Sequence, residues 1–164
     1  MSQSWKKTQN LFSKLITEPP LKERYLKRPS PKYIFDLVVN TMKKTGFPKG
    51  LFTPDEENED YFMADATHKR DFFNKLIDII QIISKKDLDI NIESILKGTE
   101  EEKTNTFLQY FYYIATSNID TEKIIKQYLN DKKKKKIINK KIPKVNDIIG
   151  VNEIIIEEKP KFIN

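Results

Sequence analysis

Residues 30–52, SPKYIFDLVVNTMKKTGFPKGLF, decide the fold of this chain. The stretch predicts one helix with both ends marked, followed by a tight connection. Ser30 can cap the first turn, and Pro31 stands at the first helical position, where helices accept proline. Gly46 supplies the left-handed residue that ends helices. Apolar residues recur at helical spacing between these ends and predict a buried stripe, made of Tyr33, Ile34, Leu37, Val38 and Met42.

Similar start and stop signals predict further helices on both sides. Upstream we expect helices over residues 4–16 and 21–27, each ended by proline. Residues 53–57 should form a short turn, followed by a loop through Tyr61 and Phe62. Thr99 and Glu102 have the spacing of a capping box. The remaining helices are expected at residues 66–85, which are apolar nearly all round and therefore central, and at 89–97, 99–117 and 121–129.

The expected architecture is an all-α domain over residues 1–131, with a basic low-complexity tail over residues 132–164. No stretch before residue 131 shows the sustained alternation of a half-buried strand. The lysine run 132–136 repels itself, so we expect the tail to be mostly disordered.

Composition indicates an intracellular protein without a membrane span. Hydrophobic residues make up 38% and charged residues 33%, cysteine is absent, and no apolar run approaches about 20 residues. The net charge of +6 is unevenly distributed. Residues 1–49 carry 11 basic and 3 acidic side chains, residues 50–131 carry 9 and 17, and residues 132–164 carry 10 and 4. A domain polarised in this way orients itself in the field of a charged partner.

Neither catalysis nor a metal or cofactor site is expected. His68 is the only histidine and lacks the companions that a triad or a metal site requires, so we expect it to be exposed to solvent. Phosphate-binding glycine loops and zinc-protease motifs are absent. The acidic segment 55–60 lacks calcium-loop spacing, and helix-start acids in a solvated loop explain it better.

The basic first third of the chain carries the candidate binding residues. Their ordinary interpretation is solvated lysines on amphipathic helices, and the alternative is a surface that meets an acidic partner. The acidic excess downstream favours the second interpretation, because a purely solvated surface tends to mix the two signs. The candidates are Lys22, Arg24, Lys27, Arg28, Lys32, Lys43, Lys44 and Lys49.

Several separated segments carry a family resemblance across residues 19–116. They are Pro19-Pro20-Leu21, Lys27-Arg28-Pro29, Lys32-Tyr33-Ile34-Phe35-Asp36, the run TGFPKGLFT over residues 45–53, the aliphatic helix 72–83, Gly98 and Glu102-Lys103-Thr104-Asn105. In order and spacing they resemble the calponin-homology-like domain of the microtubule-interacting, TRAF-binding adaptors, which are also subunits of the intraflagellar transport B complex. Relatives continue into a charged linker and a coiled coil, so we expect a fragment or a shortened paralogue.

The resemblance implies a non-enzymatic module that binds tubulin or microtubules through a basic face, in intraflagellar transport and cilium assembly. It places the protein in the cytoplasm, at the cilium, axoneme and basal body, and on the cytoskeleton. Matched motifs support Arg28, Lys32 and Lys49, whereas the other five candidates rest on local charge. The alternative is an adaptor that docks on other transport subunits, with tubulin incidental. Nucleic-acid binding through the basic tail is a weaker hypothesis, and we expect no membrane or small-molecule partner.

Overall fold

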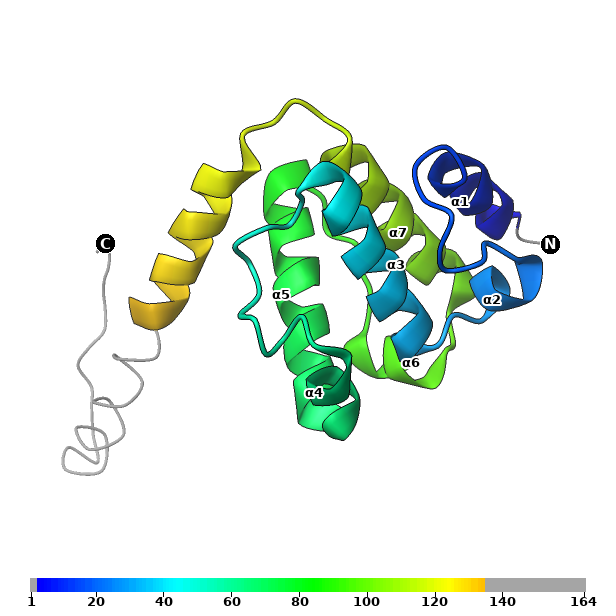
Figure 1. Cartoon of the computed structure of the whole chain (residues 1–164), viewed down its shortest axis with the longest axis horizontal. Helices are drawn as coiled ribbons and strands as arrows, with labels where there is room; N and C mark the ends of the chain where they lie inside the picture. Colours follow the sequence, from blue (N-terminus) through cyan, green and yellow to red (C-terminus); the bar gives the residue numbers. More distant parts are fainter. Residues whose placement is uncertain (1–2, 135–164) are drawn as a thin grey trace. The chain divides into compact units, whose positions relative to one another are not determined.

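The computed structural model describes residues 3–134, which contain helices and no β-strand. The all-α prediction is therefore confirmed. None of the helices in this part of the chain is long and apolar enough to span a membrane. The labelled helices are α1 (Ser4–Phe12), α2 (Glu23–Lys27), α3 (Pro31–Thr45), α4 (Glu59–Ala64), α5 (Ala66–Ser84), α6 (Ile92–Lys97) and α7 (Glu101–Ala115) (Figure 1).

The chain divides into two compact units, residues 1–126 and 127–164, and the first contains all the labelled helices. Residues 121–134 are also helical. This helix continues past the expected domain boundary at residue 131 and includes the first three lysines of the 132–136 run. The rest of the tail, for which we predicted disorder, lies outside the described residues.

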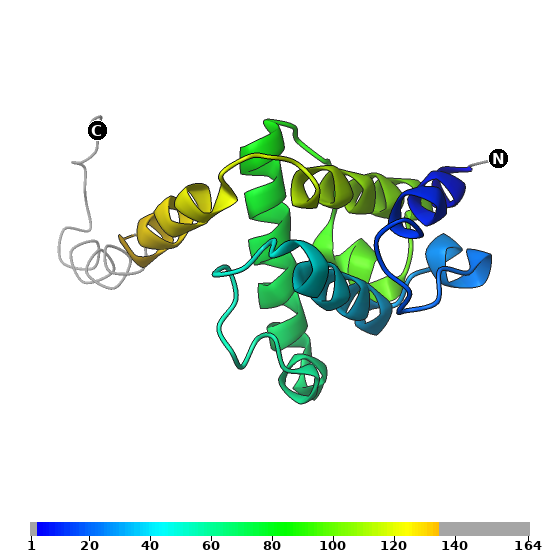
Figure 2. The ribbon, with the colours of Figure 1, turned by 45° about the horizontal axis from the view of Figure 1, so that its top comes forward.

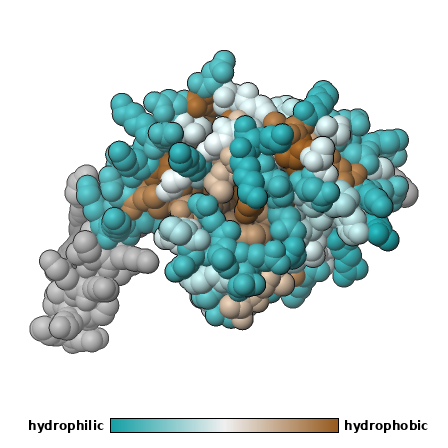
Figure 3. All heavy atoms as spheres, in the orientation of Figure 1, coloured by the Kyte–Doolittle hydropathy of each residue, from teal (hydrophilic) through white to brown (hydrophobic). Residues whose placement is uncertain are grey.

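Helix α7 lies at the centre of the first unit. It packs against α1, α2, α3 and α5, while α5 also contacts α4 and α6 (Figures 1 and 2). The central position predicted for α5 is thus shared with α7. The C-terminal end of α5 is not buried on all sides, because the apolar side chain of Ile82 is 48% exposed. Most of the face seen in Figure 3 is hydrophilic, with small apolar patches between the polar side chains.

Two groups of phenylalanine rings fill the core. Phe72 on α5 lies 4.3 Å from Phe52, 5.2 Å from Phe35 and 5.1 Å from Phe62, measured between ring centroids. Phe111 on α7 lies 6.3 Å from the Phe12 ring and 5.8 Å from the Phe47 ring. Ring pairs at such distances add a favourable term to the area that they bury. Because Phe47 and Phe52 belong to different groups, the connection after α3 is fixed at both of its ends.

The N-cap and the C-terminal glycine predicted for α3 are confirmed. The Ser30 hydroxyl oxygen accepts a hydrogen bond of 3.1 Å from the Tyr33 N–H, as an N-cap should. Gly46 adopts φ +85° and donates its N–H to the Met42 carbonyl at 2.7 Å. A side chain at Gly46 would be strained in this left-handed conformation.

Other predicted boundaries are wrong. Helix α1 ends at Phe12 instead of residue 16, and α6 begins at Ile92 instead of residue 89. The loop expected through Tyr61 and Phe62 is α4, because Asn58 accepts a hydrogen bond from the Tyr61 N–H and caps it.

The capping box predicted at Thr99 and Glu102 does not form, so this prediction is also wrong. Thr99 instead donates its hydroxyl to the Ser94 carbonyl, and left-handed Glu100 precedes α7. A capping box does occur at the expected short turn, where Thr53 and Glu56 exchange hydrogen bonds of 2.9 and 3.2 Å.

Replacing Phe72 with alanine should lower the free energy of unfolding by about 3–5 kcal/mol, because the large side chain is fully buried and its cavity cannot collapse completely. Urea unfolding of the purified chain would measure the change. Ile82→Ala on the same helix is the matched control, and it should change stability by about 0.5 kcal/mol or less, since Ile82 is exposed. Equal losses in the two variants would contradict the assigned core.

Candidate functional site

The structure separates the eight candidate cations into two groups. Lys32 lies in the first turn of α3 and Lys43 in the last, about 16 Å apart along the axis at 1.5 Å per residue. The basic residues therefore do not form one compact patch. We call Lys22, Arg24, Lys27, Arg28 and Lys32 the α2 cluster, and Lys43, Lys44 and Lys49 the turn cluster.

Two members of the α2 cluster are held by their own helix. The Lys27 ammonium lies 2.8 Å from the Glu23 carboxylate, and this hydrogen bond raises the pKa of Lys27. Arg24 donates to the Tyr25 hydroxyl at 2.9 Å and lies over the Tyr25 ring. Lys22, Glu23, Arg24 and Lys27 line a hollow of about 550 Å³.

Lys32 has two acidic partners. Its ammonium forms a short hydrogen bond to the Asp36 carboxylate and lies 3.7 Å from the Glu59 carboxylate. The hydrogen bond to Asp36 is the main cause of the raised pKa of Lys32. An acidic partner would have to compete with both carboxylates, so Lys32 is the least available member of the cluster.

Arg28 is available. It follows the last residue of α2, its side chain is exposed, and it has no ion-pair partner among residues 3–134. Its aliphatic stem lies close to Gly98 in the turn before α7. The guanidinium group is therefore free to bind an anion, while the stem is held from one side.

The turn cluster is wholly unpaired within the described part of the chain. Lys43 and Lys44 lie exposed in the last turn of α3, where cations also suit the negative end of the helix dipole. Lys49 is exposed between two fixed points, because Phe47 and Pro48 before it and Leu51 after it are buried. Hydrogen bonds from the Lys49 N–H to the Gly46 carbonyl and from the Leu51 N–H to the Pro48 carbonyl close the turn.

Three further cations, on α1 and just after it, are not among the eight candidates predicted from the sequence. Lys6, Lys7 and Lys14 are all exposed. The end of α1 and the turn after α3 both pack on α7, since Phe12 and Phe47 contact the same Phe111 ring. The signal was present in the charge count of residues 1–49, but only the tertiary contact brings these segments together.

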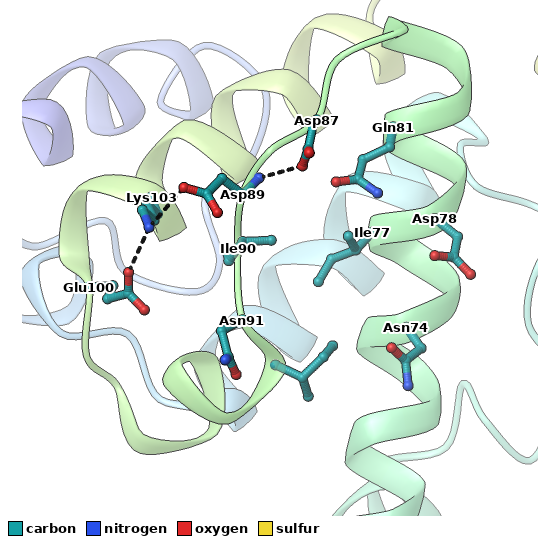
Figure 4. Close-up of a pocket in the computed structure, with 11 residues that line it drawn as sticks. Asn74, Ile77, Asp78, Gln81, Asp87, Asp89, Ile90, Asn91, Glu100 and Lys103 are labelled. Atoms are coloured by element: carbon teal, nitrogen blue, oxygen red, sulfur yellow. Dashed lines mark hydrogen bonds and ion pairs between the residues drawn. The ribbon is translucent and has the colours of Figure 1, made fainter.

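Part of the acidic excess of residues 50–131 lines a second hollow. Asp78, Asp87 and Asp89 line a space of about 540 Å³ between α5 and the segment that leads to α6 (Figure 4). Lys103 lies 3.1 Å from both Asp89 and Glu100 and neutralises one side of it. In the part of the chain that the structure describes, no group of three or more acidic, histidine or cysteine side chains is arranged to hold a metal ion.

The acidic segment 55–60 has local structural partners. Besides its capping role, Glu56 accepts a 2.6 Å hydrogen bond from the Lys75 ammonium on α5. Burial alone would raise the pKa of Glu56, but the hydrogen bonds from Lys75 and Thr53 outweigh it, and the pKa is lowered from 4.5. His68 is half-buried instead of exposed, since its ring stacks on Tyr61 at 3.7 Å and Nδ1 lies 2.6 Å from the Tyr61 carbonyl.

Residues 4–117 match the family model of the microtubule-binding protein MIP-T3 CH-like domain. The chain belongs to this family. The helical fold is accordingly a CH-like, or calponin-homology-like, domain, and the resemblance in separated motifs is confirmed. The family is described by microtubule binding and not by an enzymatic activity.

Three similar proteins share the name TRAF3-interacting protein 1. The protein from Rattus norvegicus is 32% identical over 128 residues, which cover 78% of this chain and 19% of the relative. Those from Mus musculus and Danio rerio are 32% and 33% identical over 124 residues, or 76% of this chain and 20% of each relative. The chain thus spans about a fifth of the length of these relatives.

The Glu56–Lys75 pair predicts a pH-dependent contribution to stability. Glu56→Gln keeps an acceptor for the capping box but removes the charge, and should lower the free energy of unfolding at neutral pH by about 1–2 kcal/mol. Because the folded-state pKa is lowered, the contribution is complete above pH 4.5 and is lost as pH falls through the folded value.

Urea unfolding at neutral pH and below pH 4.5 would measure this contribution, with Glu57→Gln as the control in the same turn. The difference between wild type and Glu56→Gln should shrink on acidification. A difference independent of pH would show that the ion pair is not its source.

Proposed function

We propose that this CH-like domain binds tubulin in microtubules without catalysis, using the turn cluster together with Arg28. The observation that carries the proposal is that Lys43, Lys44, Lys49 and Arg28 are exposed and lack acidic partners among residues 3–134. The family's microtubule-binding description supplies the partner. Acidic surface segments of tubulin provide the complementary charge.

Binding by this mechanism is modest in strength and sensitive to salt. Exposed ion pairs contribute about 0–1 kcal/mol each and weaken as the ionic strength rises. Several such pairs on a rigid domain add together, whereas a cation already paired within the domain gains little. The eight candidates therefore differ in how much each contributes, and the unpaired residues, which are the turn cluster and Arg28, contribute most.

Reversing the turn cluster should abolish most of the binding. We expect Lys43→Glu with Lys49→Glu to reduce affinity for stabilised microtubules by about tenfold or more, because two attractive contacts of up to about 1 kcal/mol each become repulsive. Co-sedimentation of the full chain at low and at physiological salt would measure it.

A control variant separates a local surface from total charge. Lys123→Glu with Lys126→Glu changes the net charge equally at two exposed lysines outside both clusters. This control should retain most of the affinity. Equal losses in the two double variants would indicate non-specific attraction, such as through the lysine run, and would contradict the proposed surface.

Arg28 and Lys32 should differ, although the sequence motif supports both. Arg28→Gln should weaken binding by about three- to fivefold, the equivalent of one exposed pair. Lys32→Gln should change it by less than about twofold, because Lys32 already pairs with Asp36 and Glu59. The same pelleting assay decides this, and a larger effect at Lys32 than at Arg28 would contradict the assignment of available cations.

We also propose the setting that the family resemblance implies, which is intraflagellar transport and cilium assembly on the microtubule cytoskeleton. The alternative adaptor role, docking on other transport subunits, has its own expected result. Wild-type chain that fails to pellet with microtubules at low salt, yet captures a transport subunit in a salt-insensitive way, would replace tubulin binding by the adaptor function.

A further inference from the structure

Helix α2 depends on its neighbours α1 and α7 for its conformation. It contains five residues, too few for a helix to be stable without tertiary contacts. Leu26 is fully buried, and its carbonyl accepts a 2.9 Å hydrogen bond from the Asn105 side-chain amide on α7. Asn105 is itself 0% exposed, so it cannot touch a partner. The same amide also donates to the Glu101 carbonyl of α7 at 3.0 Å, and its contact with the candidate surface is at the end of α2, next to Arg28.

Gly98 limits the position of the Arg28 side chain from the other side. A Cβ atom at residue 98 would lie 3.3 Å from Cγ of Arg28, 3.6 Å from its Nε and 3.6 Å from the Pro29 carbonyl oxygen. Gly98 also has φ +72°, which disfavours other residues. A side chain at this position would therefore press against the stem of Arg28, which would have to shift, in addition to straining the backbone.

We infer that Gly98 and Asn105 are positioning residues for Arg28. The orientation of this arginine, near the start of the chain, then depends on two residues in and just before the first turns of α7. The inference rests on the proposed function, in which Arg28 contacts an acidic partner. Asn105 fixes the carbonyl end of α2, and Gly98 leaves the space through which the Arg28 stem passes. Neither residue contributes charge to the surface.

The chain offers a matched control for each residue. Gln109 is a second buried amide on α7, but it donates to Ser4 and Thr8 on α1 at 3.0–3.2 Å and not to α2. Gly46 has φ +85°, and a Cβ there would meet nothing within 4 Å. Gln109→Ala and Gly46→Ala therefore reproduce the lost amide and the backbone strain without removing a direct contact to α2 or Arg28.

Double-mutant cycles with Arg28→Gln test the inference in the full-length chain. Asn105→Ala and Gly98→Ala should each weaken microtubule binding by about three- to fivefold, matching the loss of one exposed pair. When either change is combined with Arg28→Gln, the affinity of the double variant should lie within about twofold of the affinity of Arg28→Gln alone. Twofold is about the usual error of additivity. Gln109→Ala and Gly46→Ala, combined with Arg28→Gln, should instead give the product of the single effects.

Hydrogen exchange gives a second measurement that does not need microtubules. The Leu26 amide donates to the Lys22 carbonyl at 3.0 Å and reports the integrity of α2. Its exchange should accelerate in Asn105→Ala relative to Gln109→Ala, because only the first variant frees the end of α2.

The possible failures are distinguishable. If wild type binds and the effects of Asn105→Ala and Gly98→Ala multiply with that of Arg28→Gln, this inference is overturned while the proposed function stands. Unchanged exchange at Leu26 in Asn105→Ala would likewise overturn it. If wild type does not bind at low salt, the proposed function fails and the inference fails with it.

Discussion

The burial of one side of α7 is the constraint on which the rest of this structure depends. Helices α1, α2, α4 and α6 contain nine residues or fewer, and such helices are not stable in isolation. α7 contacts α1, α2, α3 and α5, and its Phe111 ring receives both Phe12 and Phe47. The positions of the basic segments on α1, α2 and α3 therefore follow from packing on this helix, although α7 carries little of the basic surface itself.

This arrangement explains why the family signature is spread over about a hundred residues. Segments that are far apart in the sequence meet in pairs: Pro20 with Tyr33, Leu26 with Asn105, Arg28 with Gly98, Phe47 with Phe111, and Phe52 with Phe72. Each pair joins at least one residue of the signature to another segment through a hydrogen bond, a steric fit or a ring contact. Many residues of the signature thus make tertiary contacts within the CH-like fold.

Part of the local chemistry was readable from the sequence, and the contacts between helices were not. The ends of α3 were predicted correctly because Ser30, Pro31 and Gly46 act within one turn of their own position. The capping box at Thr99 failed because Glu100, placed by contacts with Ser94 and Lys103, takes the cap position. For the candidate site, charge identified the basic residues. It could not show that Lys32 is paired with Glu59, since that contact forms only when α4 returns to the start of α3.

The buried neighbours of Lys49 have a consequence for the rate of binding. Phe47, Pro48 and Leu51 fix the backbone on both sides of this lysine before any partner arrives. No loop has to become ordered on contact, so the encounter needs only orientation of an already shaped surface. In the proposed complex with tubulin, long-range attraction would govern the association rate, and exposed ion pairs alone would give a short-lived complex. A domain built in this way would capture a charged lattice quickly and release it readily.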